Sequence, residues 1–95
     1  MIKWEYLRLW QCVAGNFIDV EPAGRVRLQW LVQQYPKTKA DVDGDLNADR
    51  LRLGSRAEWS HACHSLMDHL GSEGWELSAA TGGVWDATLY FRRQL

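Results

Sequence analysis

The chain has 95 residues and a formal net charge of −1, from 11 Lys and Arg against 12 Asp and Glu, and this length fits a single domain, residues 1–95. The charge balance excludes general nucleic-acid binding, which requires a basic excess to displace counterions. The longest apolar runs are too short to span a membrane, and the start Ile-Lys-Trp-Glu-Tyr has no signal-peptide core, which predicts a cytoplasmic protein.

Residue patterns in the first half of the chain predict strands separated by turns. Ile2–Val13 and Arg25–Val32 each alternate in side-chain type with a period of two, which is typical of half-buried strands. Phe17–Val20 is a short candidate strand between them. The polar, acidic segment from Tyr35 to Asp49 is predicted to be a loop with its turn at Asp43-Gly44. Arg50–Leu53 alternates again and is predicted to be a short strand.

The segment from Ser55 to Gly71 predicts one amphipathic helix. Ser55 and Glu58 have the spacing of a capping box, and Gly71 supplies a residue suited to the turn that ends a helix. Trp75–Ala80 and Val84–Arg92 follow as strands around a tight turn at Thr81-Gly82-Gly83. Apolar residues three and four apart form the predicted buried stripe of the helix, which comprises Trp59, Ala62, Cys63, Leu66, Met67 and Leu70. Cys12 and Cys63 are the only cysteines and are expected to be reduced.

This element order, β-β-β-α-β-β, predicts an α+β fold in which one helix packs on one face of an antiparallel sheet of about five strands. The side chains expected to face the helix are Leu7, Leu9, Val26, Leu28, Trp30, Leu51, Leu53, Leu77, Leu89 and Phe91. The opposite face would then carry aromatic side chains interleaved with arginines. Its predicted members are Trp4, Tyr6, Arg8, Trp10, Arg25, Arg27, Gln29, Arg50, Arg52, Thr88, Tyr90 and Arg92.

Three motifs resemble a known family. Gly71-Ser-Glu-Gly-Trp-Glu-Leu77 follows the predicted helix, Lys3-Trp-Glu-Tyr6 opens the chain, and Phe91-Arg-Arg93 closes it. In this order they resemble small bacterial and phage proteins grouped as domain of unknown function 4177. The resemblance implies a small α+β fold without agreed catalytic residues. It also implies structural roles for Gly71, Gly74, which lets the chain reverse, and Trp75, which anchors the following strand onto the helix.

Two patterns invite a metal-binding interpretation. His61, His64 and Asp68 share the polar face of the predicted helix at spacings that can present ligands to zinc or iron, but a fourth ligand is missing. Asp41–Asp49 is acidic like a calcium loop, but its glycine falls at the fourth position and Arg52 stands where a bidentate Glu is needed. We interpret the first as a solvated helix face and the second as an ordinary loop. No metal and no cofactor is predicted.

The sequence favours binding over catalysis, because it has no recognisable nucleophile set or phosphate-binding glycine loop. Six Trp in a chain of this size also predict a binding or oligomer surface. We expect a homo-oligomeric module that captures a small anionic, nucleotide-like ligand, since indole and phenol rings stack on rings and Arg holds phosphate. The predicted ligand-binding residues are Trp4, Tyr6, Arg8, Trp10, Arg25, Arg27, Arg52, Tyr90 and Arg92.

The family resemblance includes phage proteins, and it therefore implies a concrete version of this expectation: an anti-defence sponge that sequesters an immune signal. Two alternatives remain open. The first is an adaptor that docks another protein on the Trp- and Arg-rich sheet face. The second is a metal-dependent enzyme that uses His61, His64 and Asp68.

Overall fold

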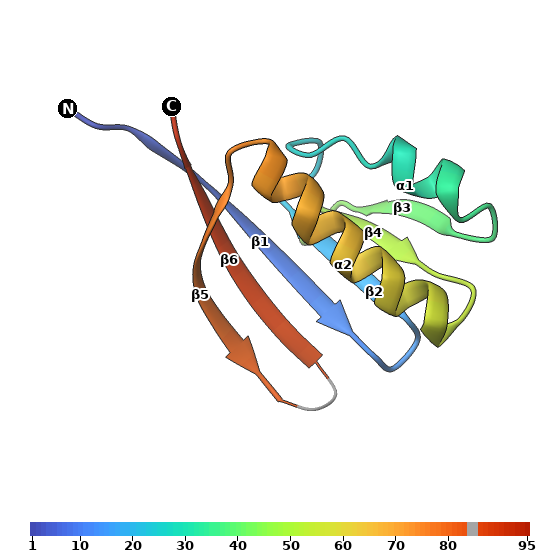
Figure 1. Ribbon diagram of the computed structural model, residues 1–95. Helices are drawn as coiled ribbons and strands as arrows, with labels where there is room; N and C mark the ends of the chain where they lie inside the picture. The colour runs from blue at the N-terminus through green and yellow to red at the C-terminus, as the bar shows by residue number, and fades with distance from the viewer. Residues whose placement is uncertain (84–85) are drawn as a thin grey trace.

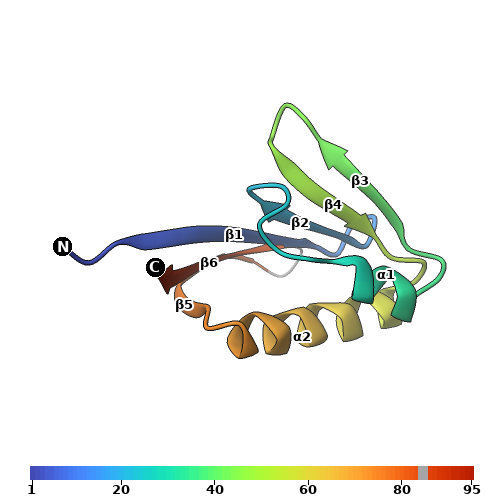
Figure 2. The same cartoon turned by 90° about the horizontal axis from the view of Figure 1, so that it is seen from above.

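The computed structural model describes residues 1–83 and 86–95, which build one six-stranded antiparallel sheet and two helices (Figure 1). Figure 2 shows both helices on the same side of the sheet, while the β3–β4 hairpin rises away on the other side. The strand order is β3-β4-β2-β1-β6-β5. The elements are β1 (Trp4–Cys12), β2 (Phe17–Glu21), α1 (Gln29–Gln34), β3 (Lys39–Asp43), β4 (Ala48–Arg52), α2 (Arg56–Ser72), β5 (Glu76–Gly82) and β6 (Asp86–Gln94).

The predicted α+β class with a helix packed on an antiparallel sheet is confirmed. The described residues form six strands and two helices instead of about five strands and one helix, and the predicted element order is wrong. The core lies between α2 and the sheet. Leu9 of β1, Ile18 of β2 and Leu66 of α2 are fully buried there. Most residues expected to face the helix do so, but Leu77 is 51% exposed because β5 is the edge strand and lies outside the area that α2 covers (Figure 1).

Helix α2 begins where the capping pattern predicts. The Ser55 hydroxyl accepts a hydrogen bond from the Glu58 backbone N–H at 3.2 Å, which satisfies one of the free donors in the first turn. Four members of the predicted stripe, Ala62, Cys63, Leu66 and Leu70, are buried. Trp59 is partly buried and donates its indole N–H to the Phe17 carbonyl at 2.8 Å. Met67 is 36% exposed and lies at the edge of the stripe.

The helix ends later than predicted. Gly71 lies inside α2, and Gly74, with φ +87°, is the residue that adopts the left-handed conformation. The Gly74 N–H donates to the Gly71 carbonyl and the Trp75 N–H donates to the Leu70 carbonyl, which together form a Schellman motif. Trp75 is buried against the core directly before β5. The chain therefore reverses at Gly74, and Trp75 fixes the start of β5 relative to the helix.

The predicted strand Arg25–Val32 is wrong. Its second half belongs to α1, a six-residue helix preceded by an irregular segment. Leu28 and Leu31, three residues apart, are buried, and Tyr35 follows four residues later on the same side. This helical spacing overlaps the two-residue alternation of the apolar residues, so periodicity alone favoured the wrong element.

The predicted loop from Tyr35 to Asp49 contains a hairpin. Residues of β3 pair with β4 in antiparallel register, and the expected turn at Asp43-Gly44 connects them. The Asp43 carboxylate accepts the backbone N–H groups of Asp45 and Leu46, both at 3.1 Å, as in an Asx turn. Asp43 is therefore used to build the turn. The predicted strand start at Val84 lies outside the described residues.

Cys63 is predicted to be unreactive in the folded protein. It is packed under α2, and this burial raises the pKa of its thiol from the ordinary 9.0 to about 12. Since the thiolate is the nucleophile, alkylation at pH 8 should be suppressed there. Iodoacetamide should label the half-buried Cys12 first and reach Cys63 only after unfolding, as measured by peptide mass spectrometry. Equal labelling of both cysteines in the native protein would contradict this burial.

Neither α1 nor α2 is long and apolar enough to cross a lipid bilayer.

Candidate ligand-binding site

The sheet face opposite α2, here called the open face, contains most of the predicted aromatic and arginine residues. Strand register places them on it. Tyr6 is opposite Arg92, Arg8 is opposite Tyr90, and Trp10 is opposite Thr88. On the other side of β1, Trp10 is opposite Asp19, which in turn is opposite Arg50. Trp4 and Arg52 complete this face, with Arg92 lying over the Trp4 ring and Arg52 over the Phe17 ring at 4.5 and 4.3 Å.

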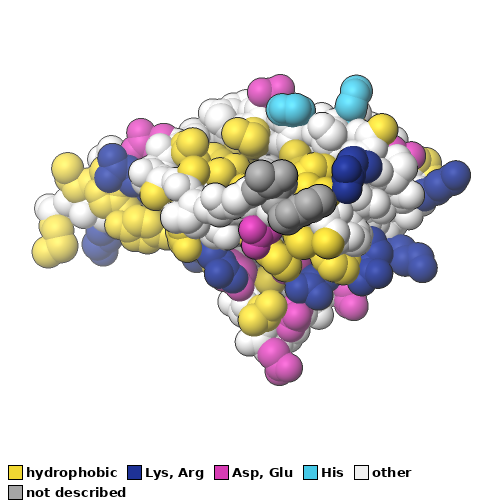
Figure 3. All heavy atoms as spheres, turned by 90° about the horizontal axis from the view of Figure 1, so that it is seen from below, with side chains coloured by type: hydrophobic (Ala, Val, Ile, Leu, Met, Phe, Trp, Pro, Cys, Tyr) yellow, Lys and Arg dark blue, Asp and Glu magenta, His cyan; other side chains and the backbone are white. Residues whose placement is uncertain are grey.

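Acidic side chains neutralise most arginines of the open face. Arg8 contacts Glu21 at 2.5 Å, and Arg92 contacts Glu76 at 2.8 Å. Figure 3 views the molecule from below, along the sheet and not onto the open face, and it shows basic and acidic side chains close to one another there as well. A paired guanidinium has fewer free donors and less net charge to offer an anion. The open face is therefore a mixed aromatic and ion-paired surface rather than a basic one.

The most buried ion pair on this face joins β2 to β4. Asp19 is 3% exposed and accepts two hydrogen bonds from Arg50, from Nε and from a terminal nitrogen, each at 2.8 Å. The hydrogen bond to Asp19 raises the pKa of the Arg50 guanidinium. Asp43 lies farther away, at 3.9 Å from Arg50. This forked pair is a structural link between strands and not a free anion site.

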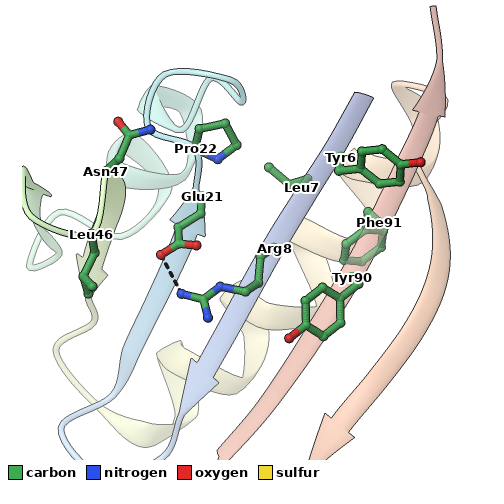
Figure 4. A pocket seen from close by; sticks show the side chains of 9 residues that line it. All are labelled: Tyr6, Leu7, Arg8, Glu21, Pro22, Leu46, Asn47, Tyr90 and Phe91. Carbon is green, nitrogen blue, oxygen red and sulfur yellow. Dashed lines mark hydrogen bonds and ion pairs between the residues drawn. The ribbon is translucent and has the colours of Figure 1, made fainter. Parts of the chain in front are cut away.

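A hollow of about 280 Å³ opens on this face between β1, β6 and the β3–β4 turn (Figure 4). Tyr6 and Tyr90 stand along one side of it, and Leu46 stands on the other side. The Arg8–Glu21 ion pair lies between them. Tyr6 is 61% exposed, so aromatic surface is available there to a partner. We call this feature the tyrosine hollow.

The structure separates Arg25 and Arg27 from the rest of the predicted site. They lie on the segment before α1, on the side of the sheet that carries the helices, and not on the open face. There they border a cavity of about 470 Å³ near the end of α2. This cavity, here called the Arg–Trp pocket, is lined by Arg25, Val26, Arg27, Trp30, His69, Glu73, Trp75 and Arg93. Its volume is within the usual range of small-molecule sites.

Both aromatic rings and guanidinium groups line the Arg–Trp pocket. The rings of Trp30 and His69 are in contact, with centroids 4.9 Å apart. The Arg93 guanidinium lies 4.4 Å from the centroid of the Trp75 ring and donates to the Glu73 carbonyl at 3.0 Å. The Trp30 indole N–H donates to the Arg27 carbonyl at 2.9 Å, which holds the ring beside this segment.

The arginines of the Arg–Trp pocket differ in how many hydrogen-bond and ion-pair partners they have. Arg93 forms an ion pair with Glu5, and Arg25 lies 4.0 Å from the same carboxylate while donating to the Tyr6 carbonyl. The exposed Arg27 guanidinium has no hydrogen-bond or ion-pair partner among residues 1–83 and 86–95. Arg25 and Arg93 share the carboxylate of Glu5, and the Glu73 carboxylate lies 3.8 Å from His69, so the three arginines outnumber the two carboxylates by one charge.

Sequence reasoning missed the aromatic half of this pocket. Trp30 was expected in the core, and Trp75 only as an anchor. Arg93 could have been found, because it alternates with Arg92 on the last strand and must therefore point to the helix side of the sheet. His69 and Glu73 come together with it only because the Schellman turn brings β5, and with it β6, to the end of α2.

The metal-binding interpretations find no geometric basis in the described part of the chain. His61, His64 and Asp68 are exposed on α2. Within residues 1–83 and 86–95, no group of three His, Cys, Asp or Glu side chains is placed to hold a metal ion.

A scan against protein-family models finds no matching family, and searches of curated proteins and of solved structures find no match either. The resemblance to domain of unknown function 4177 therefore remains a prediction from the three sequence motifs.

Proposed function

We propose that this protein is a cytoplasmic, non-catalytic, homo-oligomeric binding module, and that it captures a small anionic, ring-bearing molecule in the Arg–Trp pocket. One observation carries the proposal: the guanidinium of Arg27, which has no partner in the described part of the chain, lies beside Arg25 and the half-buried ring of Trp30 in one cavity. Guanidinium groups bind phosphate through two parallel hydrogen bonds, and a Trp ring offers a stacking surface. A nucleotide supplies both complementary parts.

The remaining residues of the pocket add specificity to this proposal. Trp30 and Arg27 also line a second hollow of about 560 Å³, so a ligand can reach them from two directions. Glu73 is exposed and can accept hydrogen bonds from the N–H groups of a base. A phosphate held by Arg25 and Arg27, with its base on Trp30, would use each of these groups. The phage sponge for an immune signal is one biological form of this function.

Arg27→Ala is expected to weaken ligand binding about 10- to 100-fold, the effect of losing one charge-assisted contact. Its guanidinium binds no other described residue, so the fold should be unaffected, whereas Arg25 also donates to the Tyr6 carbonyl. The protein would first be purified gently and weighed by native mass spectrometry, then titrated calorimetrically with a panel of nucleoside phosphates and cyclic dinucleotides. Arg56→Ala, at an exposed arginine in the first turn of α2, is the matched control.

Two results would contradict ligand capture in the Arg–Trp pocket. In the first, the native protein carries no small molecule and binds no member of the panel. In the second, a ligand binds but Arg27→Ala and Arg56→Ala retain the same affinity, which would place the ligand elsewhere.

The tyrosine hollow supports a second candidate function, a protein-interaction adaptor. Tyr6, Tyr90 and Leu46 expose aromatic and aliphatic surface around it, and exposed Tyr side chains are common anchors at protein interfaces. Failure of the nucleotide panel would favour this function. In that case Tyr6→Ser should abolish binding of a purified partner, and Arg27→Ala should leave that binding unchanged.

A further inference from the structure

The two edge strands of the sheet differ sharply in charge. β3, at one edge, carries Lys39, Asp41 and Asp43 at alternate positions. β5, at the other edge, spans seven residues with Glu76 as its one charged residue and without Lys, Arg or Pro. Charges and prolines on edge strands prevent pairing with other chains. Charge therefore protects the β3 edge against such pairing, whereas the part of the β5 edge from Ala79 to Gly82, beyond the irregularity, carries no such protection.

The β5 strand is also exposed over its whole length. Every residue from Glu76 to Gly82 is exposed, and Leu77 presents half of its aliphatic side chain to solvent. Figure 1 shows β5 at the margin of the sheet beyond β6, while α2 lies over the other half. The Ser78 hydroxyl turns inward and donates to the Tyr90 carbonyl at 3.0 Å, at the irregularity between Leu77 and Ala79. Among the described strands β5 pairs with β6 alone, so the backbone groups on its other side are available for pairing.

We infer that β5 pairs edge to edge, in antiparallel orientation, with β5 of a second copy of this chain. The inference deepens the homo-oligomeric part of the proposed function and is independent of the ligand. All other strands in the described residues already belong to the sheet. A strand that pairs with the free edge of β5 must therefore come from another molecule. An identical strand suits this edge, because twofold symmetry makes a surface complementary to itself and closes the assembly at two subunits.

Side-chain chemistry also favours a second copy. Ser78, Ala79, Ala80, Thr81 and Gly82 are small and uncharged, so two such strands can approach without steric or electrostatic conflict. Antiparallel pairing places the two Glu76 carboxylates at opposite ends of the interface, where they do not repel each other. The result would be a continuous sheet across two subunits. No residue of β5 lines the Arg–Trp pocket, so the two sites can be tested separately.

The test is the solution mass, measured by light scattering after size exclusion over a range of protein concentrations. The unmodified protein should have twice the mass of the chain. Ala80→Lys places a cation at the centre of the β5 edge and should raise the dimer dissociation constant at least tenfold. Ala40→Lys, the same change at the centre of the β3 edge, should leave the dimer intact. A cooperative thermal melt would confirm that both variants fold.

Hydrogen exchange of the unmodified protein provides a measurement that needs no variant. The β5 amides should become more protected as protein concentration rises, while the β3 amides should not. A monomer at every concentration would overturn both the homo-oligomer and this interface. A dimer that Ala80→Lys leaves unchanged, or β5 exchange independent of concentration, would overturn the β5 interface alone. Loss of nucleotide binding in Arg27→Ala would leave this inference unaffected.

Discussion

Replacing Arg50 with methionine is expected to lower the free energy of unfolding by about 2–4 kcal/mol. This is somewhat less than the effect of removing one partner of a fully buried ion pair, because solvent reaches part of the arginine. Asp19 is only 3% exposed beside Arg50, and the substitution removes both 2.8 Å hydrogen bonds that its carboxylate accepts from Arg50. For a chain of 95 residues, total stability is about 5–14 kcal/mol. Urea unfolding followed by circular dichroism should therefore show a clearly earlier transition.

Arg52→Met is the matched control for this experiment. Arg52 lies two residues farther along β4 on the same face and stacks on Phe17, without an acidic partner in the described residues. Its replacement should lower the free energy of unfolding by about 1 kcal/mol or less, which is the contribution of an exposed cation–π contact. Adding Asp19→Asn to Arg50→Met should recover part of the loss, because it removes the buried charge. Equal transitions for Arg50→Met and Arg52→Met would show that the forked pair contributes little.

Leu66→Ala is expected to destabilise the protein by about 2–5 kcal/mol, the usual cost of a cavity at a fully buried leucine. Leu66 is fully buried in the centre of α2 against the sheet. Met67→Ala, the next residue, should cost about 1 kcal/mol or less, since its side chain is already partly in water. The sequence pattern assigned both residues to the same buried stripe. The denaturant midpoints of the two variants therefore test whether Leu66 is more deeply buried than Met67, a difference that the structure shows and the sequence pattern does not predict.

If the two variants unfold at the same denaturant concentration, α2 must pack on the sheet with a different rotation about its axis. A larger loss of stability in Met67→Ala than in Leu66→Ala would contradict the helix orientation most directly. Both substitutions raise helix propensity, or leave it nearly unchanged, so any difference between them reflects burial.

Local sequence signals were sufficient for the elements whose stabilising contacts are close in the chain. The start of α2 follows from Ser55 and Glu58, and β1 follows from its alternation. The left-handed glycine was misplaced by three residues, at Gly71 instead of Gly74, because both glycines fit the local pattern. The same short-range ambiguity explains α1, where apolar residues at Leu28 and Leu31 satisfy a helical spacing within an apparent strand.

The sequence by itself determined the α+β class, the amphipathic helix and the gathering of aromatic and arginine side chains on β1 and β6. Only the tertiary structure decided which charges remain free. Strand order brings Asp19 between Trp10 and Arg50, and Glu76 opposite Arg92, so most arginines of the open face are neutralised. Partners on neighbouring strands are far apart in the chain, and no local pattern specifies them. Arg27 has no partner among residues 1–83 and 86–95, because its segment leaves the sheet and joins the end of α2.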